Sequence, residues 1–316
     1  MKILIFTLLL LSSGLVYGQN QFNEIITLNT ATGTLYGTIT VADSLHPTPI
    51  VIIIPGSGPT DQNGNSGMAM HTNAYKLLAE ALAQNNISSL RYDKRGIGKS
   101  YKAAIEQHDL RFEVFIDDVV LWLKQLKSDK RFSSIYLAGH SQGSLIGMVA
   151  AQKTAVDGFI SIAGAGYSID KVLETQLKDK LSDSLYQESV DILSSLKEGQ
   201  KVDSVSPWLY NLFRPAIQPY MISWIKYAPC EEIQKLTTPL LIINGTTDLQ
   251  VSVDNAERLH EASEESQLLL IENMNHVLKE APIEQKANMA TYIDGQLPLV
   301  PKLVDELVLF ISKTKK

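Results

Sequence analysis

The sequence predicts an α/β protein with a mostly parallel sheet of about eight strands flanked by helices, and three observations support this prediction. Short, nearly continuous apolar runs recur along the chain, as expected for parallel strands buried on both faces. Between these runs, apolar residues repeat at a spacing of three to four, which is typical of helices with one buried face. Strands and helices that alternate in this way favour a parallel sheet covered on both sides. Finally, one long block without β-rich runs, residues 167–235, predicts an all-helical insertion.

The first two strands are expected to form an antiparallel hairpin at one edge of the sheet. Residues 23–42 alternate polar and apolar side chains around a turn at Gly33. The later strands are the buried apolar runs, at residues 49–56, 87–93, 133–140, 157–166, 239–248 and 266–273. Helices are expected at residues 73–86, 113–129, 141–152, 254–262 and 303–312.

The chain therefore divides into a core in two parts, residues 19–166 and 236–316, and a helical cap, residues 167–235. Aromatic side chains crowd the second half of the cap, namely Trp208, Tyr210, Phe213, Tyr220, Trp224 and Tyr227. They either line a pocket or pack a small core within the cap, and the sequence leaves both possibilities open.

The N-terminal residues 1–18 have the three parts of a secretory signal peptide. Lys2 precedes an apolar run from Ile3 to Leu11, and small residues follow before Gly18. The alternative is a membrane anchor, but the apolar run falls short of the roughly 20 residues that span a bilayer. We therefore expect cleavage near Gly18 and a secreted or periplasmic mature protein without stable membrane insertion.

Composition and charge argue against several other classes of protein. The 316 residues carry a formal net charge of −6 and no run of Lys or Arg, so a nucleic-acid partner is not expected. The single cysteine, Cys230, cannot form a disulfide within one chain. No cluster of His, Cys and carboxylates has metal-ligand spacing, so neither a metal nor a cofactor is expected. The sequence makes no prediction of oligomeric state.

The motif Gly139-His140-Ser141-Gln142-Gly143 lies where a buried strand gives way to a helix. So tight a strand-to-helix turn pushes its central residue toward positive φ, which is costly for a residue with a Cβ. Small residues two positions before and after the centre keep the turn free of clashes. A purely structural turn would more naturally place glycine at the centre, so the sequence predicts that Ser141 is a nucleophile.

A serine becomes a good nucleophile only when a base removes its proton, and histidine is the usual base. His140 adjoins Ser141, but its side chain is expected to point away from the apex of the turn. His276 follows the last core strand. Parallel sheets gather their ligand-binding loops at the carboxyl ends of the strands, where Ser141 is also expected. His276 is therefore the predicted base.

The acid that orients this histidine should also follow a strand, between the serine and the histidine in the chain. Asp248 meets this requirement, and Asp254 is the competing candidate. Asp254 has Glu257 three residues later, which is the pattern of a helix capping box. Asp248 is therefore predicted to fix the imidazole tautomer of His276, with Asp254 as the alternative.

Acyl transfer also needs hydrogen-bond donors for the oxyanion that forms on the substrate carbonyl. One predicted donor is the backbone N–H of Gln142, the residue after the nucleophile. The second should come from the glycine-rich loop after the strand at residues 49–56. The backbone N–H of Ser57 is the first choice there and that of Gly58 the second.

These segments together resemble the serine-hydrolase branch of the α/β-hydrolase superfamily. The resemblance is carried, in chain order, by "PGSGPTDQNGN", "RYDKRGIGKS", "GHSQG", "NGTTD" and "NMNH". More narrowly, the chain is similar to bacterial secreted esterases and serine aminopeptidase-like proteins. The resemblance covers the chain from about Asn23 onward and implies the α/β-hydrolase fold with a helical cap. It implies the same triad, Ser141, Asp248 and His276, and the same oxyanion donors, Ser57 and Gln142.

Two further points follow from the resemblance. It implies that Asp93 and Arg95 are structural residues that brace loops near the site. The chain departs from many members of the family at Pro55-Gly56, where they carry His-Gly.

The expected reaction is acyl transfer to water, with short to medium carboxylic esters as small-molecule substrates. A peptidase would commonly need an acidic group for the amino terminus of its substrate, and the cap offers Glu174, Glu188, Glu231 and Glu232. Aminopeptidase or acyl-peptidase activity is therefore the alternative. A more distant alternative is a non-catalytic binding protein with the same fold.

Overall fold

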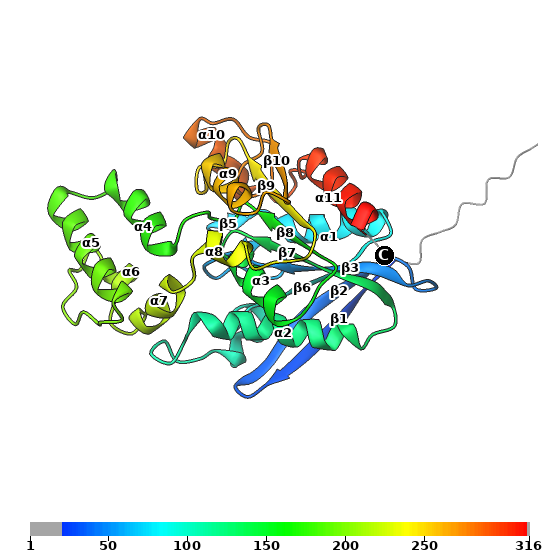
Figure 1. Ribbon diagram of the computed structural model, residues 1–316, viewed down its shortest axis with the longest axis horizontal. Coiled ribbons are helices and arrows are strands. Elements are labelled where there is room, and N and C mark those ends of the chain that lie inside the picture. Colours follow the sequence, from blue (N-terminus) through cyan, green and yellow to red (C-terminus); the bar gives the residue numbers. More distant parts are fainter. Residues whose placement is uncertain (1–20, 315–316) are drawn as a thin grey trace, which may run out of the picture.

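The computed structural model describes residues 21–314, so the predicted signal peptide, residues 1–18, lies outside the described residues. Figure 1 shows a sheet running through the middle of the molecule, with a group of helices extending to its left.

Eight strands of the described chain form the main sheet. They are β1 (Phe22–Thr30), β2 (Gly33–Val41), β3 (Thr48–Ile54), β6 (Ser88–Tyr92), β7 (Phe132–His140), β8 (Gly158–Ile162), β9 (Leu240–Gly245) and β10 (Gln267–Ile271). Their order in the sheet is β1-β2-β6-β3-β7-β8-β9-β10. β2 pairs antiparallel with β1 and β6, and the other neighbouring strands are parallel. The predicted fold class, including the antiparallel hairpin at one edge, is confirmed.

The central strand β3 explains why the sheet is covered on both faces. Ile50, Ile52 and Ile54 belong to the apolar cluster on one face, whereas Val51 and Ile53 belong to the cluster on the other. Successive side chains of a strand point to opposite faces, so a continuous apolar run needs a helical layer on each side.

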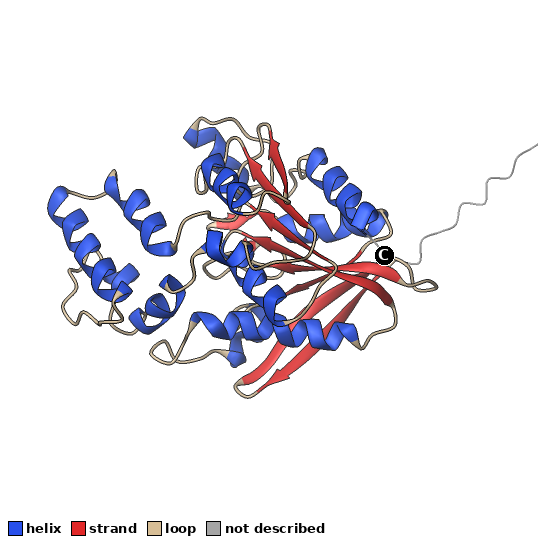
Figure 2. Ribbon diagram, in the orientation of Figure 1, coloured by secondary structure: helices blue, strands red, loops and turns tan. Residues whose placement is uncertain are grey.

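Helices supply these two layers, as Figure 2 shows. α2 (Phe112–Lys127) and α3 (Gln142–Lys153) pack in the first cluster, and α1 (Ala74–Gln84) and α11 (Pro301–Thr314) pack in the second. All four lie within two or three residues of the boundaries that hydrophobic periodicity predicts.

The register of the parallel strands brings their carboxyl ends to one edge of the sheet. Ile54 of β3 pairs with Gly139 of β7, and Ile162 of β8 pairs with Ile243 of β9. The loops that follow these strands and β10 therefore open at the same edge. These loops carry the residues singled out in the sequence, Ser57, Ser141, Asp248 and His276.

Between β8 and β9 the described chain is helical, as predicted. It forms α4 (Ile169–Lys178), α5 (Asp183–Lys197), α6 (Tyr210–Phe213), α7 (Gln218–Ile225) and α8 (Pro229–Ile233). Figure 1 shows α4 to α7 at the left of the sheet. Their buried apolar side chains form a cluster of their own: Ile192, Leu193, Leu196, Leu209, Phe213, Met221 and Ile225. The exact limits of the cap, residues 167 and 235, stay a prediction.

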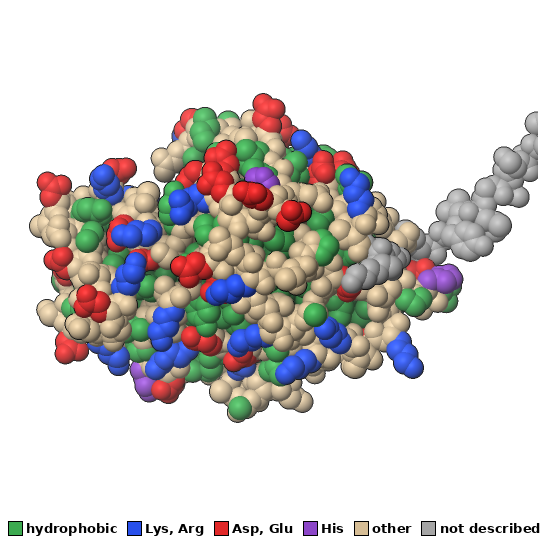
Figure 3. All heavy atoms as spheres, viewed as in Figure 1, with side chains coloured by type: hydrophobic (Ala, Val, Ile, Leu, Met, Phe, Trp, Pro, Cys, Tyr) green, Lys and Arg blue, Asp and Glu red, His purple; other side chains and the backbone are tan. Residues whose placement is uncertain are grey.

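The surface of the cap is highly charged. Figure 3 shows acidic and basic side chains interspersed over its visible face. Some of them pair within the cap, as Lys171 does with Glu174 and Lys197 with Asp170. No helix of residues 21–314 combines the length and the apolar character that crossing a bilayer requires.

The predicted capping box at Asp254 is wrong. The helix concerned, α9 (Val253–Ala262), has Ser252 at its N-cap, with an extended backbone at φ −68° and ψ 159°. Asp254 instead occupies the second position of the helix, where its carboxylate accepts a hydrogen bond from the Ser252 hydroxyl. A carboxylate in the first turn is still favoured, because the helix dipole is positive at this end.

Several short elements have no counterpart in the sequence prediction. These are β4 (Asn65–Ser66), β5 (Met70–His71), α10 (Gln285–Ala290) and the 3₁₀ turns at Gly98–Ala103 and Thr291–Ile293. Elements of two to six residues are too short to display a hydrophobic period.

Candidate active site

Ser141 lies in the turn between β7 and α3 with φ 54° and ψ −123°. A non-glycine residue at positive φ costs about 1–3 kcal/mol and persists only where its surroundings enforce it. The glycines on both sides are needed for steric reasons. A Cβ on Gly139 would lie 2.3 Å from the carbonyl oxygen of Gly143, and a Cβ on Gly143 would lie 2.3 Å from that of Ile54.

Asp248 and His276 are joined by a hydrogen bond of 2.7 Å between Oδ2 and Nδ1. The other carboxylate oxygen, Oδ1, accepts hydrogen bonds from the backbone N–H groups of Gln250 and Val251, at 2.7 and 2.9 Å. Both side chains are buried. Asp248 is therefore held in one orientation by three donors.

These contacts keep the carboxylate of Asp248 charged. Burial alone would raise the pKa of Asp248, but the attraction of His276 and the hydrogen bonds from His276 and the two amides outweigh burial, so the pKa lies below its usual value. An ionised carboxylate only accepts hydrogen bonds, so Nδ1 of His276 carries the proton of the shared bond. When the imidazole is neutral, the lone pair is then on Nε2, the nitrogen that a base at this position would use.

Ser141 and His276 lie on the walls of one small cavity of about 80 Å³. Ser57 also lines this cavity, and so does Gly56, whose backbone packs directly against the nucleophile. A Cβ on Gly56 would lie 3.2 Å from the Cβ of Ser141. The structure thus brings together the predicted serine, histidine and aspartate, and it places the glycine-rich loop beside them.

The two predicted oxyanion donors flank Ser141. Gln142 is the first residue of α3, so its N–H has no acceptor within the helix. Within the described chain, the N–H of Ser57 donates to no protein acceptor. Ser57 lines both cavities around Ser141, whereas Gly58 lines neither. Of the two candidates in this loop, Ser57 is therefore the one beside the nucleophile.

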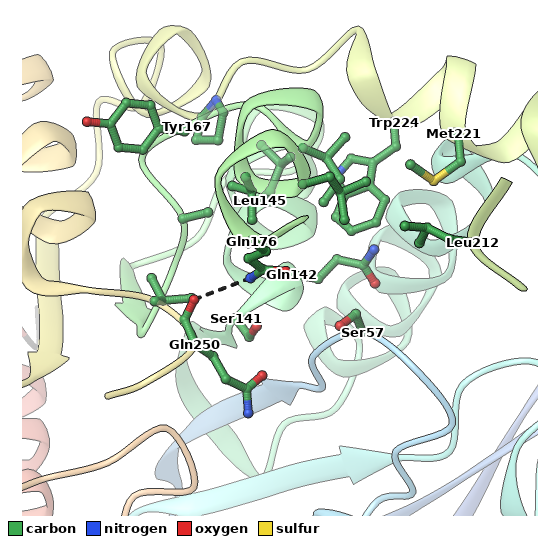
Figure 4. A pocket seen from close by; sticks show the side chains of 16 residues that line it. Ser57, Ser141, Gln142, Leu145, Tyr167, Gln176, Leu212, Met221, Trp224 and Gln250 are labelled. Carbon is green, nitrogen blue, oxygen red and sulfur yellow. Dashed lines mark hydrogen bonds between the residues drawn. The ribbon is translucent and has the colours of Figure 1, made fainter. Parts of the chain in front are cut away.

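The larger cavity beside Ser141 has a volume of about 300 Å³. Figure 4 shows Trp224, Met221 and Leu212 of the cap and Leu145 of α3 around it, with Ser141 and Gln142 at one side. The remaining lining residues are Ser57, Ala165, Tyr167, Ile169, Val172, Leu173, Gln176, Pro229, Gln250 and Val251. None of these described residues is charged, so the cavity suits an uncharged, mainly apolar group.

The cap is attached to the nucleophile turn by one specific contact. The side-chain amide of Gln142 donates to the hydroxyl of Tyr220 on α7, at 2.7 Å. Close by, Trp224 stacks on Phe112 of α2 with ring centroids 5.5 Å apart. The aromatic residues of the cap therefore have both of the roles left open by the sequence, since Trp224 lines the cavity and Phe213 belongs to the cap's own core.

His140 has a role that the sequence did not reveal. Its Nε2 lies 2.8 Å from the carbonyl oxygen of His276, so Nε2–H is the donor, and Nδ1 accepts from the Tyr75 hydroxyl at 2.8 Å. The same hydroxyl accepts from the N–H of Gly56. Burial, with a smaller repulsion from His276, lowers the pKa of His140 to about 3 and keeps the ring neutral. His140 thus links the glycine-rich loop to the backbone of His276.

Asp93 and Arg95 brace loops, in agreement with the resemblance. Asp93 accepts from the backbone N–H groups of Gln62 and Lys99, at 2.8 and 2.9 Å. Arg95 forms a two-pronged ion pair with Asp118 on α2. Residues 21–314 contain no group of three or more His, Cys, Asp or Glu side chains that could hold a metal ion.

A strained serine in a strand-to-helix turn, beside a histidine held by an aspartate, is the arrangement that the α/β-hydrolase class shares. The sequence profile described as serine aminopeptidase, S33, matches residues 64–280. Because this match covers more than half of the chain, the protein belongs to that family.

Comparison with individual proteins finds an esterase and a probable aminopeptidase. The chain is 30% identical over 262 residues to the esterase EstD of Thermotoga maritima, covering 79% of this chain. It spans only 60% of the length of that relative. A 64-residue segment, 20% of the chain, is 34% identical to the probable aminopeptidase YbaC of Bacillus subtilis and covers 20% of it.

Solved structures agree on the fold. Est1E of Butyrivibrio proteoclasticus matches with a TM-score of 0.61 and 18% identity, over 91% of this chain and 99% of Est1E. At this level of identity the likeness shows the fold alone.

Proposed function

We propose that the protein is a serine hydrolase that cleaves carboxylic esters through an acyl-enzyme on Ser141. One observation carries the proposal: Ser141, held at positive φ, shares a small cavity with His276, whose Nδ1 is bonded to Asp248. The likeness to the esterase EstD supports the same reaction.

In the proposed mechanism, Oγ of Ser141 attacks the ester carbonyl carbon while Nε2 of His276 takes the hydroxyl proton. The backbone N–H groups of Ser57 and Gln142 stabilise the oxyanion of the tetrahedral intermediate. The intermediate collapses to the acyl-enzyme, and His276 returns its proton to the departing alcohol. Water, activated by the same nitrogen, then releases the acid and regenerates Ser141.

The two cavities suggest which part of the ester lies where. His276 must reach the oxygen of the departing alcohol, and His276 lines the smaller cavity but not the larger one. The alcohol therefore belongs in the smaller cavity and the acyl chain in the larger, apolar one. Short to medium acyl chains with a small alcohol are the proposed substrates. On the face drawn in Figure 3, charged side chains are interspersed over the cap, which favours soluble esters over aggregated lipid.

Aminopeptidase activity is the second candidate, because the family description and the relative YbaC point to it. An aminopeptidase has to bind the charged amino terminus of its substrate, usually with a carboxylate. The four cap glutamates considered in the sequence, Glu174, Glu188, Glu231 and Glu232, all lie in the described chain, and none lines the larger cavity. This uncharged lining favours esters over free peptides.

Labelling with a fluorophosphonate probe tests the serine hydrolase proposal directly. The mature wild-type protein is expected to be labelled, and the Ser141→Ala variant is not, because the probe reacts with an activated serine. No labelling of either protein would instead favour the non-catalytic binding protein, and equal labelling of the two would show that a residue other than Ser141 reacts, which would also overturn the proposal. An unchanged melting temperature of the variant is the control for folding.

A substrate panel separates ester from peptide hydrolysis. We expect p-nitrophenyl esters of about two to eight acyl carbons to be turned over faster than aminoacyl p-nitroanilides, because the larger cavity has no charged partner for an α-ammonium group. The measurement is kcat/KM for each compound, corrected for the turnover left in Ser141→Ala. Faster turnover of the anilides would make aminopeptidase the preferred function.

A further inference from the structure

Lys94 lies in the loop after β6 and is almost completely buried, with 5% of its surface exposed. Its Nζ donates hydrogen bonds to the carbonyl oxygens of Gly56 and Gly58, the latter at 2.8 Å. Among the described residues, no carboxylate forms an ion pair with it. A buried ammonium group is costly, and here its hydrogen bonds go to two backbone carbonyls of the glycine-rich loop. The ring of Phe115 lies on another side, with its centroid 5.9 Å from Nζ.

Holding the carbonyl of Gly56 also fixes the direction of the N–H of Ser57. The two groups belong to the same planar trans peptide, so they point in opposite directions. Because Lys94 lies on the carbonyl side, the N–H of Ser57 is turned the other way. That N–H has no protein acceptor in the described chain, and its residue lines both cavities around Ser141.

The second carbonyl bound by Lys94 fits the same interpretation. Gly58 is followed by Pro59, which has no N–H, so only the first of the two peptides has a donor to direct. Gly58 has φ +72°, a conformation natural to glycine, and glycine loses more conformational freedom on ordering than other residues. A loop of this composition needs an external restraint to keep one peptide orientation.

We propose that Lys94 is the positioning residue of the oxyanion hole. It holds the Gly56–Ser57 peptide so that the N–H of Ser57 points toward the substrate carbonyl. The proposal rests on the proposed function, because it takes the N–H of Ser57 as an oxyanion donor. Lys94 has a second effect through the same peptide. A hydrogen bond to a carbonyl oxygen polarises the peptide and makes its N–H a stronger donor.

The test replaces Lys94 with methionine, which has a similar length and no donor. The control is Lys99→Met, five residues further along the same segment, where the side chain is exposed. For each protein, kcat and KM are measured with a p-nitrophenyl ester, and active sites are counted by fluorophosphonate labelling. The affinity for a trifluoromethyl ketone is measured as well, since its adduct with Ser141 carries an oxyanion.

For Lys94→Met we expect kcat per labelled site to fall about 10- to 100-fold, because removing an oxyanion donor outright typically costs 10²- to 10³-fold. KM should change less than about twofold, and the affinity for the trifluoromethyl ketone should fall in parallel with kcat. Lys99→Met should match the wild type. A role confined to loop stability would instead lower the number of labelled sites and leave kcat per site unchanged, which would overturn the proposal.

A second variant keeps the test decisive if Lys94→Met does not fold. Lys94→Gln retains an NH₂ donor on a side chain one bond shorter, so it should reach the loop less well and show a smaller loss than methionine. Wild-type values of kcat per site and ketone affinity in Lys94→Gln would then overturn the proposal. Failure of the proposed function is recognised separately, because in that case the wild type itself is neither labelled nor active.

Discussion

At the scale of single residues, local geometry at Ser141 follows directly from the sequence. A Cβ on either of the two glycines around it would lie 2.3 Å from a backbone oxygen, so only glycine fits at both positions. The spacing of the glycines in the motif therefore follows from the geometry of the turn. Asp248 and His276 could be predicted for a different reason. Each follows a core strand, and parallel strands bring such positions to one edge of the sheet.

Other residues of the site could not be found in this way. Tyr75 contacts His140 across 65 positions, and Lys94 contacts the glycine-rich loop across 36 to 38. Tyr75 lies on the buried face of a regular helix, where a tyrosine resembles any other core residue. Their contacts depend on how distant segments pack, and no pattern within one sequence encodes that packing. Ser252 is a different case, because it lies only two residues before Asp254 and its hydroxyl bonds with that residue and the next one. Two nearby residues that both suit an N-cap leave the exact start of the helix undecided in the sequence.

Burial of Lys94 should make stability depend on pH. Desolvation lowers the pKa of Lys94 from 10.5 to about 7. Between about pH 7 and 10.5 the unfolded chain holds this proton and the folded protein does not, so raising the pH favours folding. Below pH 7 both states are protonated and the contribution is constant. We expect the free energy of unfolding of the wild type to rise relative to that of Lys94→Met between pH 7 and 9.

Urea unfolding of both proteins at pH 7, 8 and 9 measures this difference. Lys99→Met serves as the control, because an exposed lysine should leave the pH dependence of the wild type unchanged. Parallel curves for wild type and Lys94→Met would contradict the expectation.

At the scale of elements, long strands and helices could be predicted because burial imposes a period on them. β3 reads as a continuous apolar run, and α1 and α2 show apolar side chains at helical spacing. The cap could be predicted as helical but not in its arrangement. Which of its aromatic residues face the cavity depends on how α7 rests on α2 and α3, through Trp224 on Phe112 and Tyr220 on Gln142.

The cap should decide which acyl chains fit. In Trp224→Ala, removal of the indole enlarges the larger cavity, so kcat/KM for long acyl chains should rise about tenfold relative to short ones. Trp208→Ala is the matched control, since Trp208 belongs to the same cap and is 83% exposed. Its chain-length profile should match that of the wild type, as measured with the p-nitrophenyl ester series. An unchanged profile in Trp224→Ala would exclude the larger cavity as the acyl site.

At the scale of the whole molecule, the eight-stranded sheet acts as a frame that gathers groups from remote parts of the chain. Ser57, Ser141, Asp248 and His276 come from loops after β3, β7, β9 and β10. Most neighbouring strands of the sheet are also consecutive in the chain, but β6 lies between β2 and β3, so that β2 pairs with β6 and β3 with β7. This crossover in the middle of the sheet could be expected only from the resemblance to a known fold.

We also propose that residues 1–18 direct export, with a mature protein that begins at Gln19. The lysine, apolar run and small residues of this segment support the proposal. Expression of the full chain in a bacterial host should yield protein outside the cytoplasm, with Gln19 at its N-terminus by mass spectrometry. A chain with charged residues in the apolar run, Leu8→Arg and Leu10→Arg, should stay uncleaved in the cytoplasm. Recovery of uncleaved wild type from the cytoplasm would contradict export.

The separate apolar cluster of the cap has a consequence for how such a protein can diversify. The proposed bond-breaking groups all belong to loops of the sheet, whereas much of the wall of the larger cavity, the proposed acyl site, belongs to helices that pack around their own core. Substitutions in α4 to α7 can therefore change which ester is accepted while the chemistry is inherited intact. Gln142 is the exception, because its backbone lies in one part and its side chain holds Tyr220 in the other. Exchange of the cap between relatives would have to preserve this contact together with the packing of α7 on α2, where Trp224 stacks on Phe112 and the Ser223 hydroxyl accepts from the N–H of Phe112.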